Sequence, residues 1–130
     1  MSRKVVCSIC SRSKREDADL LPAIERYTGS HIRAVEEISK EQGRPFFVLS
    51  GVYGIISSEE LIPYYDHLFV KDEIPELLPK VMRQIKEANI SSVDFYTKDK
   101  PNWEPYRHVL SVAADNSGIP LNIILLEDDD

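Results

Sequence analysis

Hydroxyl, thiol and cationic side chains are concentrated in residues 8–15, directly after a short apolar segment. Serine hydroxyls, lysine and arginine side chains and backbone N–H groups can together bind a phosphate or another anion. We expect Cys10, Ser11 and Lys14 to contact such a ligand. The segment contains no glycine, so its spacing is not that of a P-loop. A solvated polar loop without a ligand is the alternative interpretation.

A cation at the start of a predicted helix is a second candidate. The sequence predicts that Ser30 caps this helix, which places Arg33 in the first turn, where the helix dipole disfavours positive charge. We therefore expect an anionic partner for Arg33, either a carboxylate of the protein or a ligand. An Arg33 side chain that extends into solvent is the alternative. His31 is more typical of a surface position, although its pKa range suits an acid or a base.

Residues 50–54 form a glycine-rich turn with hydrogen-bonding side chains. Gly51 and Gly54, three positions apart, allow a tight turn and a close approach of a ligand to the backbone. Ser50 offers a hydroxyl group, and Tyr53 offers an aromatic face with a phenol. These groups suit a planar, hydrogen-bonding ligand such as a nucleobase. A structural glycine turn beside core tyrosines is the alternative.

Further aromatic and charged groups follow in residues 63–67. Tyr64 adds an aromatic ring to the ligand-binding candidates, and Asp66 adds a carboxylate beside His67. A carboxylate close to aromatic rings is suited to proton transfer, so Asp66 is the candidate general base. Tyr53 is the other candidate catalytic residue. Residues 63–73 have no clear periodicity, and a lid, a hairpin and a partner surface all remain open.

The two cysteines, Cys7 and Cys10, form a C-x-x-C motif. In thioredoxin-like proteins this motif opens a helix, whereas Cys7 lies within a predicted strand. A zinc site would need further ligands from His31, His67 and His108, which are scattered along the sequence. We therefore expect no metal ion and no cofactor. A redox or metal protein that uses both cysteines stays as an alternative.

Apolar segments that alternate with helical periodicity predict the elements that position these residues. We expect strands at 5–9, 46–49, 93–97 and 121–126, long helices at 17–27, 30–42, 75–88 and 103–116, and a helical turn capped by Ser57. Such strands are typical of a parallel sheet. The predicted fold is a small three-layer α/β sandwich of about four mostly parallel strands, with helices on both faces. Ligands bind beyond the carboxyl ends of such strands, so we expect the site after Ile9 and Leu49.

Length and composition limit the class of protein. The 130 residues suit one domain, which we place at 1–126, with an acidic tail at 127–130 that we expect to be disordered. The 42% hydrophobic and 29% charged residues are typical of a globular protein. The net charge of -6 argues against a strongly electrostatic nucleic-acid binder. We find no signal peptide or membrane span, and we expect a cytoplasmic protein whose oligomeric state the sequence does not give.

Residues 47–56, followed by 61–64, resemble the signature of the YaaA peroxide-stress family, with Leu-Ser-Gly-x-Tyr-Gly and a later Pro-Tyr. The sequence is also similar to short uncharacterised prokaryotic and phage domains that share this core. Those domains add an early Cys-Ser-x-x-Lys loop, which residues 10–14 resemble, and a Tyr…Arg segment, which residues 27–33 resemble. The resemblance therefore adds Tyr27 and Ser30 to the ligand-binding candidates.

The resemblance to YaaA implies a link to peroxide protection and DNA binding, but YaaA proteins are much longer. The short domains usually have one tyrosine before the aspartate, whereas Tyr64 and Tyr65 both precede Asp66 here. Related domains accompany enzymes of modified-nucleobase metabolism, which agrees with a planar ligand.

Our leading hypothesis is a small domain that binds or acts on a nucleotide, a nucleoside or a nucleic-acid base. Phosphate would be held by Ser11, Lys14 and Arg33, and the base or sugar would contact Ser50 and Tyr53. The alternative is a non-catalytic stress-response module that binds DNA or a protein partner. The acidic net charge weakens the DNA version of that alternative.

Overall fold

The computed structural model describes residues 3–126, and the predicted acidic tail at 127–130 lies outside this range. The first half of the described chain contains β1 (Arg3–Ile9), β2 (Leu21–Pro22), α1 (Ala23–Arg26), α2 (Ser30–Gln42), β3 (Phe46–Ser50), β4 (Gly54–Ser57) and β5 (Leu61–Ile62). The second half contains the 3-10 helix η1 (Lys71–Glu73), α3 (Ile74–Glu87), β6 (Ile90–Thr97), the 3-10 helix η2 (Pro101–Trp103), α4 (Glu104–Ser117) and β7 (Leu121–Leu125).

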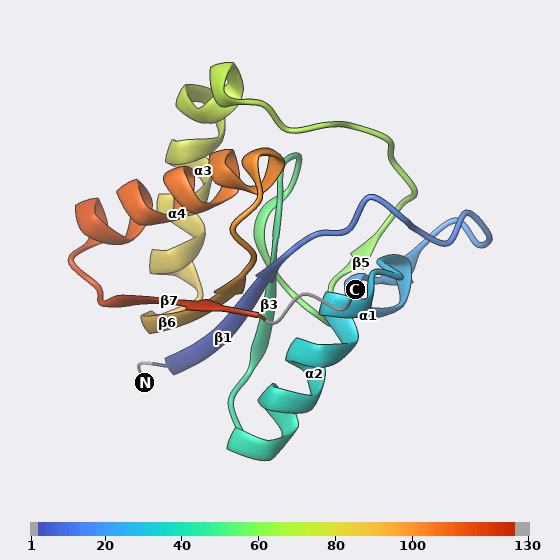
Figure 1. The fold of residues 1–130 in the computed structure, drawn as a ribbon, viewed down its shortest axis with the longest axis horizontal. Coiled ribbons are helices and arrows are strands. Elements are labelled where there is room, and N and C mark those ends of the chain that lie inside the picture. The colour runs from blue at the N-terminus through green and yellow to red at the C-terminus, as the bar shows by residue number, and fades with distance from the viewer. Residues whose placement is uncertain (1–2, 127–130) are drawn as a thin grey trace.

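The central sheet contains five strands in the order β4-β3-β1-β6-β7. β1 pairs in parallel with β3 and β6, and β6 pairs in parallel with β7. Within this sheet only β4 is antiparallel, because a tight turn joins it to β3. Helix α2 covers one face of the sheet, and α3 and α4 cover the other (Figure 1). The predicted α/β fold with helices on both faces is thus confirmed, with β4 as an additional strand.

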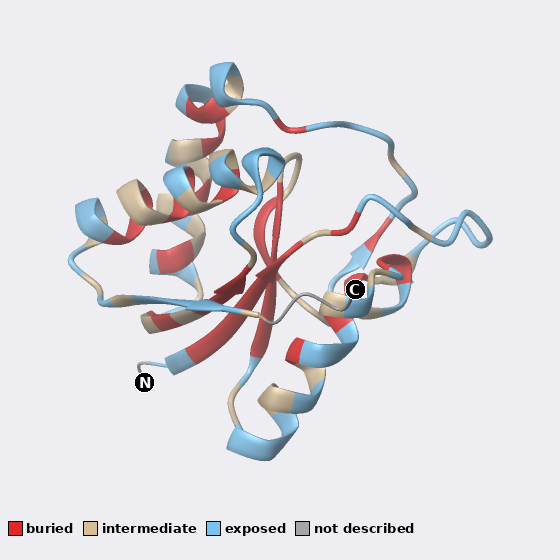
Figure 2. Ribbon diagram, viewed as in Figure 1, coloured by how far each residue is buried: buried red, intermediate tan, exposed pale blue. Residues whose placement is uncertain are grey.

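Side chains of the central strand alternate between two apolar cores, as expected for a strand with a period of two. Val5 and Cys7 face the core beneath α3 and α4, which contains Val81. Val6 faces the core beneath α2, together with Ile32. The middle of the sheet is therefore buried on both faces (Figure 2), and residues at the carboxyl ends of its strands have a rigid support.

The helix predicted at 17–27 is wrong over most of its length, since only Ala23–Arg26 is helical. The cause is Arg26, whose side chain is fully buried. Its guanidinium group donates hydrogen bonds to the carbonyl oxygen of Ile62 and to four backbone carbonyl oxygens before α1, those of Arg15 (at 2.7 Å), Asp17, Ala18 and Asp19. These bonds hold the segment as an irregular loop, in which Ala18 has a φ of 67°.

Two further predictions need correction. The helical turn predicted at Ser57 is absent from the described structure, because Ser57 ends β4 and its hydroxyl oxygen accepts the N–H of Glu59 in a turn. The last predicted strand is present as β7, but it forms an exposed edge and is not enclosed like the strands at the centre. No helix within residues 3–126 is long and apolar enough to cross a membrane.

Candidate functional site

The connections that follow β1 and β6 leave the sheet toward opposite faces. β1 leads to α2 on one face, and β6 leads to α4 on the other. Neighbouring parallel strands with diverging connections create a crevice at their carboxyl ends, which is the usual ligand position in such sheets. A cavity of about 360 Å³ lies in this crevice, within the size range of small-molecule sites. We call it the β1–β6 pocket.

Cationic side chains dominate the charge of the β1–β6 pocket. Its walls include Arg12 and Lys14 from the loop after β1, and Lys98 and Lys100 from the loop after β6. Asp66 is the one acidic residue among the described residues that line it. A cluster of like charges in a concave site attracts ligands of opposite charge. The described lining of the pocket thus carries more cationic than acidic side chains, although the whole chain carries a net charge of -6.

The N-terminus of α2 forms one wall of the pocket through Gly29, Ser30 and His31. The prediction that Ser30 caps this helix is wrong by one position, because Gly29 is the N-cap and Ser30 is the first helical residue. Among the described residues, no side chain caps the helix, and its first turn contains no acidic residue. The first N–H groups of a helix lack partners within the helix and carry the positive end of its dipole. Ser11 supports the wall, because its hydroxyl oxygen accepts the Gly29 N–H at 3.2 Å and its O–H group donates to the Ser13 carbonyl oxygen at 2.6 Å.

His31 is held in one orientation at the base of the pocket. Its Nε2 lies 3.1 Å from the carbonyl oxygen of Ile9 and 3.3 Å from that of Cys10. Because both partners are acceptors, Nε2 carries the hydrogen and Nδ1 is the acceptor nitrogen of the neutral ring. The centroid of the His31 ring lies 4.9 Å from that of the Trp103 ring. Burial lowers the pKa of His31, so the neutral form predominates at neutral pH.

Residues 63–70 cross from β5 toward α3 without regular secondary structure (Figure 1), and we call them the strap. Tyr65 and Phe69 anchor the strap. The Tyr65 hydroxyl lies 2.5 Å from the hydroxyl of Tyr27. Phe69 is buried, and its ring centroid lies 5.0 Å from that of Tyr106.

Asp66, His67 and Leu68 lie between these anchors and line the pocket. The Asp66 carboxylate forms no hydrogen bond or ion pair with another residue of the described chain. His67 Nε2, in contrast, lies 2.7 Å from Glu73 Oε2. The strap therefore presents Asp66 to the pocket as a carboxylate without a partner in the described structure.

The residues of the turn between β3 and β4 contact other residues of the protein. The buried Ser50 hydroxyl oxygen accepts the N–H groups of Val52 at 3.1 Å and Tyr53 at 3.0 Å. A Cβ atom at Gly51 would lie 2.4 Å from the Cβ of Phe69. Gly54 has a φ of 78°, and a Cβ atom there would lie 2.1 Å from Gln84 Oε1. These contacts require glycine for packing at both positions.

The β1–β6 pocket thus brings together five of the predicted site residues: Cys10, Ser11, Lys14, Ser30 and Asp66. The other seven lie outside the pocket lining: Tyr27, Arg33, Ser50, Gly51, Tyr53, Gly54 and Tyr64. Tyr53 packs edge-on against Tyr65 at 5.2 Å between ring centroids, and Tyr64 is exposed. Most of the predicted residues of the β3–β4 turn therefore contact the strap and lie outside the pocket.

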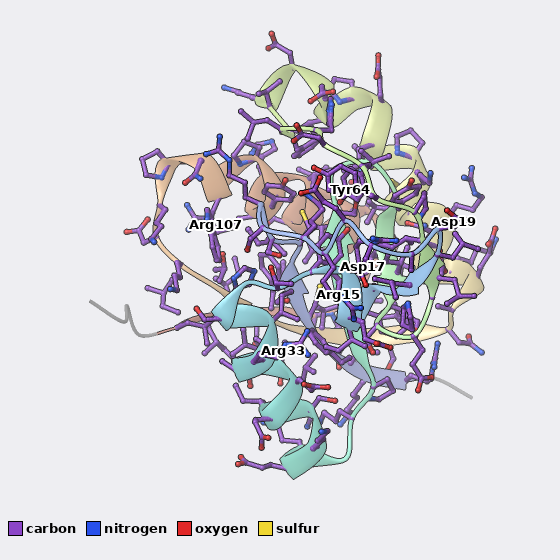
Figure 3. All side chains as sticks on the ribbon, turned by 90° about the vertical axis from the view of Figure 1, so that its right-hand side faces the viewer. Arg15, Asp17, Asp19, Arg33, Tyr64 and Arg107 are labelled. Atoms are coloured by element: carbon purple, nitrogen blue, oxygen red, sulfur yellow. The ribbon has the colours of Figure 1, made fainter. Side chains whose placement is uncertain are left out.

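Arg33 has its anionic partner within the protein. Its guanidinium group donates to the carbonyl oxygens of Ile24 and Tyr27 and lies 3.4 Å from Glu36 Oε1. Figure 3 shows Arg33 extending from α2. Of the two partners predicted for this cation, the structure contains the carboxylate of the protein. The side chain links α2 to the end of α1.

The two cysteines have different environments. Cys7 lies within β1, and Cys10 is the first residue after this strand. Cys7 lies in the core beneath α3 and α4, where burial raises the pKa of its thiol. The Cys10 sulfur lies 3.5 Å from the Tyr106 hydroxyl at the pocket wall. Neither forms a disulfide, and no group of three or more metal-ligating side chains occurs within residues 3–126.

The part of the pocket that sequence reasoning missed comes from the loop after β6. Lys98, Lys100, Asn102 and Trp103 contribute to this wall. Their sequence signal was present, because polar residues and a tryptophan directly follow a predicted strand at 93–97. The strand order was needed to use it, since β6 and not β3 provides the diverging connection beside β1.

The residues that carry the resemblance to YaaA, 47–56 and 61–64, form β3, the following turn, β4, β5 and the start of the strap. They therefore belong to the scaffold around the pocket more than to its lining. Comparisons of this chain with protein-family models, curated proteins and solved structures give no match.

Proposed function

We propose that the protein binds a small phosphorylated ligand with a planar ring, of the nucleotide class, in the β1–β6 pocket. The observation that carries this proposal is the meeting of three features in one cavity. They are the N-terminus of α2, the side chains of Arg12 and Lys14, and the aromatic ring of Trp103. The first two suit a phosphate group, and the third suits a planar ring.

The phosphate would lie between α2 and the loop after β1. Lys14 is already held near this position, because its Nζ lies 4.7 Å above the ring of Tyr65 and 3.3 Å from the carbonyl oxygen of Arg12. The Arg12 guanidinium group forms no hydrogen bond or ion pair with any other described residue. Guanidinium groups and phosphates form charge-assisted, bidentate hydrogen bonds, so Arg12 has an unused donor set of the appropriate kind.

The planar part of the ligand would contact Trp103, which His31 holds from one side. Stacking of a nucleobase on an aromatic side chain contributes about 1–3 kcal/mol and depends little on the identity of the base. The pocket alone therefore supports the ligand class and does not select one base.

Asp66 and His31 are the groups of the pocket that suit proton transfer. We propose Asp66 as the general base for a reaction of the bound ligand, because its carboxylate faces the pocket without a partner in the described chain. His31 is positioned by the carbonyl groups of Ile9 and Cys10, and its Nδ1 is a second proton acceptor. Tyr53 lies outside the pocket lining and would act through Tyr65 and the strap.

We propose that this chain shares a scaffold with YaaA proteins but binds a different ligand. This interpretation is supported by the contacts of the β3–β4 turn, whose glycines and Ser50 contact Phe69, Gln84 and the turn itself.

A thermal-shift titration tests the proposal. The probes are inorganic phosphate, AMP, GMP, CMP, UMP and the four corresponding nucleosides. We expect the nucleotides to raise the melting temperature in a saturable manner and the nucleosides to raise it less, because only the nucleotides carry the phosphate. Lys14→Ala should remove most of the difference. The matched control is Lys40→Ala, at an exposed lysine in the last turn of α2, far along the helix from the pocket.

Equal shifts in Lys14→Ala and in the original protein, or no shift with any nucleotide, would contradict the proposal. A short single-stranded DNA that stabilises the protein, with an affinity that falls steeply with salt, would instead support the DNA-binding alternative.

A further inference from the structure

β7 is an open edge of the central sheet. Within residues 3–126, no strand pairs with the side of β7 that faces away from β6. Ile123 is 43% exposed and Leu125 is 59% exposed, and Figure 2 shows this edge as the exposed margin of a buried sheet. Native edge strands are usually protected by charged residues, proline or a bulge. The sequence of β7, Leu-Asn-Ile-Ile-Leu, contains neither charge nor proline.

The direction of the unpaired backbone groups follows from two hydrogen bonds. The Val93 N–H donates to the carbonyl oxygen of Pro120 at 3.1 Å, and the Leu126 N–H donates to the carbonyl oxygen of Thr97 at 2.7 Å. Even-numbered positions at both ends of β7 therefore direct their backbone groups toward β6. Because this direction alternates along a strand, the odd-numbered residues direct their N–H and C=O groups outward. These residues are Leu121, Ile123 and Leu125.

The same three residues place their side chains on one face. Val93 is in register with Leu121, and Phe95 is in register with Ile123. Val93 and Phe95 belong to the core beneath α3 and α4, so their partners in β7 also project toward that face. The odd-numbered residues of β7 thus combine free backbone groups with an apolar stripe beside α4.

We propose that β7 pairs antiparallel with β7 of a second copy of this chain, about a twofold axis at Ile123. In this register Ile123 lies opposite Ile123 of the other copy, and Leu121 lies opposite Leu125. Every outward N–H and C=O group of the three residues then has a partner, and the two apolar stripes form one continuous surface. A twofold interface uses the same surface on both copies, and this edge is complementary to itself.

The polar side chains beside β7 favour a second copy as the occupant. A groove between α4 and β7 is lined by Ile123 and by side chains of α4. Ser111 lies at the middle of the groove, with His108 toward one end and Asp115 toward the other. A twofold axis through this middle exchanges the ends, which brings His108 of one copy toward Asp115 of the other. Within the described chain, neither of these two side chains forms a hydrogen bond or an ion pair.

Arg107 lines the same end of the groove, but its charge is offset within its own copy by Asp99 at 3.9 Å and Glu104 at 4.0 Å. If the two copies were related in the parallel sense, identical ends of the groove would lie side by side, and the Asp115 carboxylates of the two copies would repel each other. The charge pattern and the backbone pattern therefore select the same antiparallel arrangement.

Sedimentation-velocity ultracentrifugation of the purified protein across a concentration series tests this proposal. We expect a dimer whose population rises with concentration. Ile123→Lys should shift the protein to the monomer by at least tenfold in dissociation constant, because two lysines would face each other at the axis. The matched control is Leu61→Lys, since Leu61 is 57% exposed on β5, away from this edge, and should leave the dimer intact.

Two results would overturn the proposal. One is a monomer at all concentrations up to several hundred micromolar, which is roughly the weak end of specific self-association. The other is a dimer that Ile123→Lys leaves unchanged, which would assign association to another surface. Asp115→Arg should also weaken the dimer, and adding His108→Asp to it should restore much of the affinity if the groove charges pair as proposed.

Amide hydrogen exchange provides a readout that requires no substitution. We expect the amides of Leu121, Ile123 and Leu125 to become protected as the protein concentration rises. Those of Asn122 and Ile124 should be protected at all concentrations, because they bond to β6. Uniform protection of all five amides, or no change with concentration, would contradict the pairing.

Discussion

The β1–β6 pocket and the β3–β4 turn contain similar residue types, but their polar groups have different partners. In the turn, the Ser50 hydroxyl oxygen accepts two backbone N–H groups and lies 2.9 Å from the Tyr65 hydroxyl. In the pocket, the side chains of Arg12 and Asp66 have no partner among the described residues. A buried polar group that is fully bonded within the protein stabilises the fold, whereas unpaired groups in a cavity are available to a ligand. The comparison separates two sets of residues that look equally functional in the sequence.

The largest effect on stability is expected for a side chain added at Gly51. Its Cβ atom would lie 2.4 Å from that of Phe69, so Gly51→Ala should lower the free energy of unfolding by about 3 kcal/mol. For a domain of this size the melting temperature would fall by roughly 10 °C. Calorimetric melting measures this change. Gly43→Ala is the control, because Gly43 has open space around its Cα and should cost only about 1 kcal/mol for its φ of 64°.

The opposite pattern is expected for Arg12→Ala in the pocket. Loss of one charge-assisted contact should weaken nucleotide binding about tenfold to a hundredfold, while the free energy of unfolding changes by less than about 0.5 kcal/mol. Titration calorimetry with a nucleoside monophosphate, together with a melting curve, measures both quantities. Arg33→Ala is the matched arginine control on α2, and it should leave binding unchanged and reduce stability by about 1 kcal/mol. If Arg33→Ala weakened nucleotide binding and Arg12→Ala left it unchanged, the assignment of Arg12 to the ligand site and of Arg33 to the scaffold would be wrong.

An intermediate effect on stability is expected where the turn holds the strap. Tyr65→Phe removes the hydroxyl that joins Tyr27 to Ser50 and should cost about 1–2 kcal/mol. Ser50→Ala should cost a similar amount, and the double variant should cost less than the sum, because both changes break the same contact. Urea denaturation of the four proteins measures this coupling. Strictly additive losses would show that the two hydroxyls do not act as one network.

The smallest effect concerns pH and His31. Burial lowers the pKa of His31 in the folded protein below its value of about 6.5 in the unfolded chain. The unfolded state therefore takes up a proton first as the pH falls. The stability that comes from keeping His31 neutral in the folded protein is complete above about pH 6.5 and is lost as the pH falls below that value. The slope is at most about 1.4 kcal/mol per pH unit. Melting curves between pH 7.5 and 5 should show this loss, and His31→Asn should remove it; an unchanged slope in that variant would assign the effect to another group.

Several elements of the fold could be predicted because their signals are local. α2 begins at Ser30, one position before the start implied by a cap at that residue, and ends at the predicted Gln42, where Gly43 adopts the left-handed conformation that closes a helix. α4 ends in the same way at Gly118. The helix predicted at 17–27 failed because Arg26 is bonded to carbonyl groups from two segments, which is a tertiary interaction that no local pattern contains.

The candidate site was predicted only in part for the same reason. The loop after β1 was identified from its composition, and Asp66 from its neighbours. The loop after β6 was missed because its position beside β1 depends on the strand order, which is a property of the whole chain. The glycines of the β3–β4 turn suggested a ligand, but the atoms that require them belong to Phe69 and Gln84. A glycine pattern shows that something lies close to the backbone without showing what it is.

Chemical-shift mapping by NMR tests the central claim most directly. AMP would be titrated into the isotopically labelled protein and the backbone amides followed. We predict concentration-dependent shifts at residues 10–14, 29–31 and 98–103, which surround the β1–β6 pocket. The amides of Val52 and Tyr53, which are bonded to Ser50, should remain close to their positions in the free protein. Shifts centred on the β3–β4 turn with an undisturbed pocket would contradict the account.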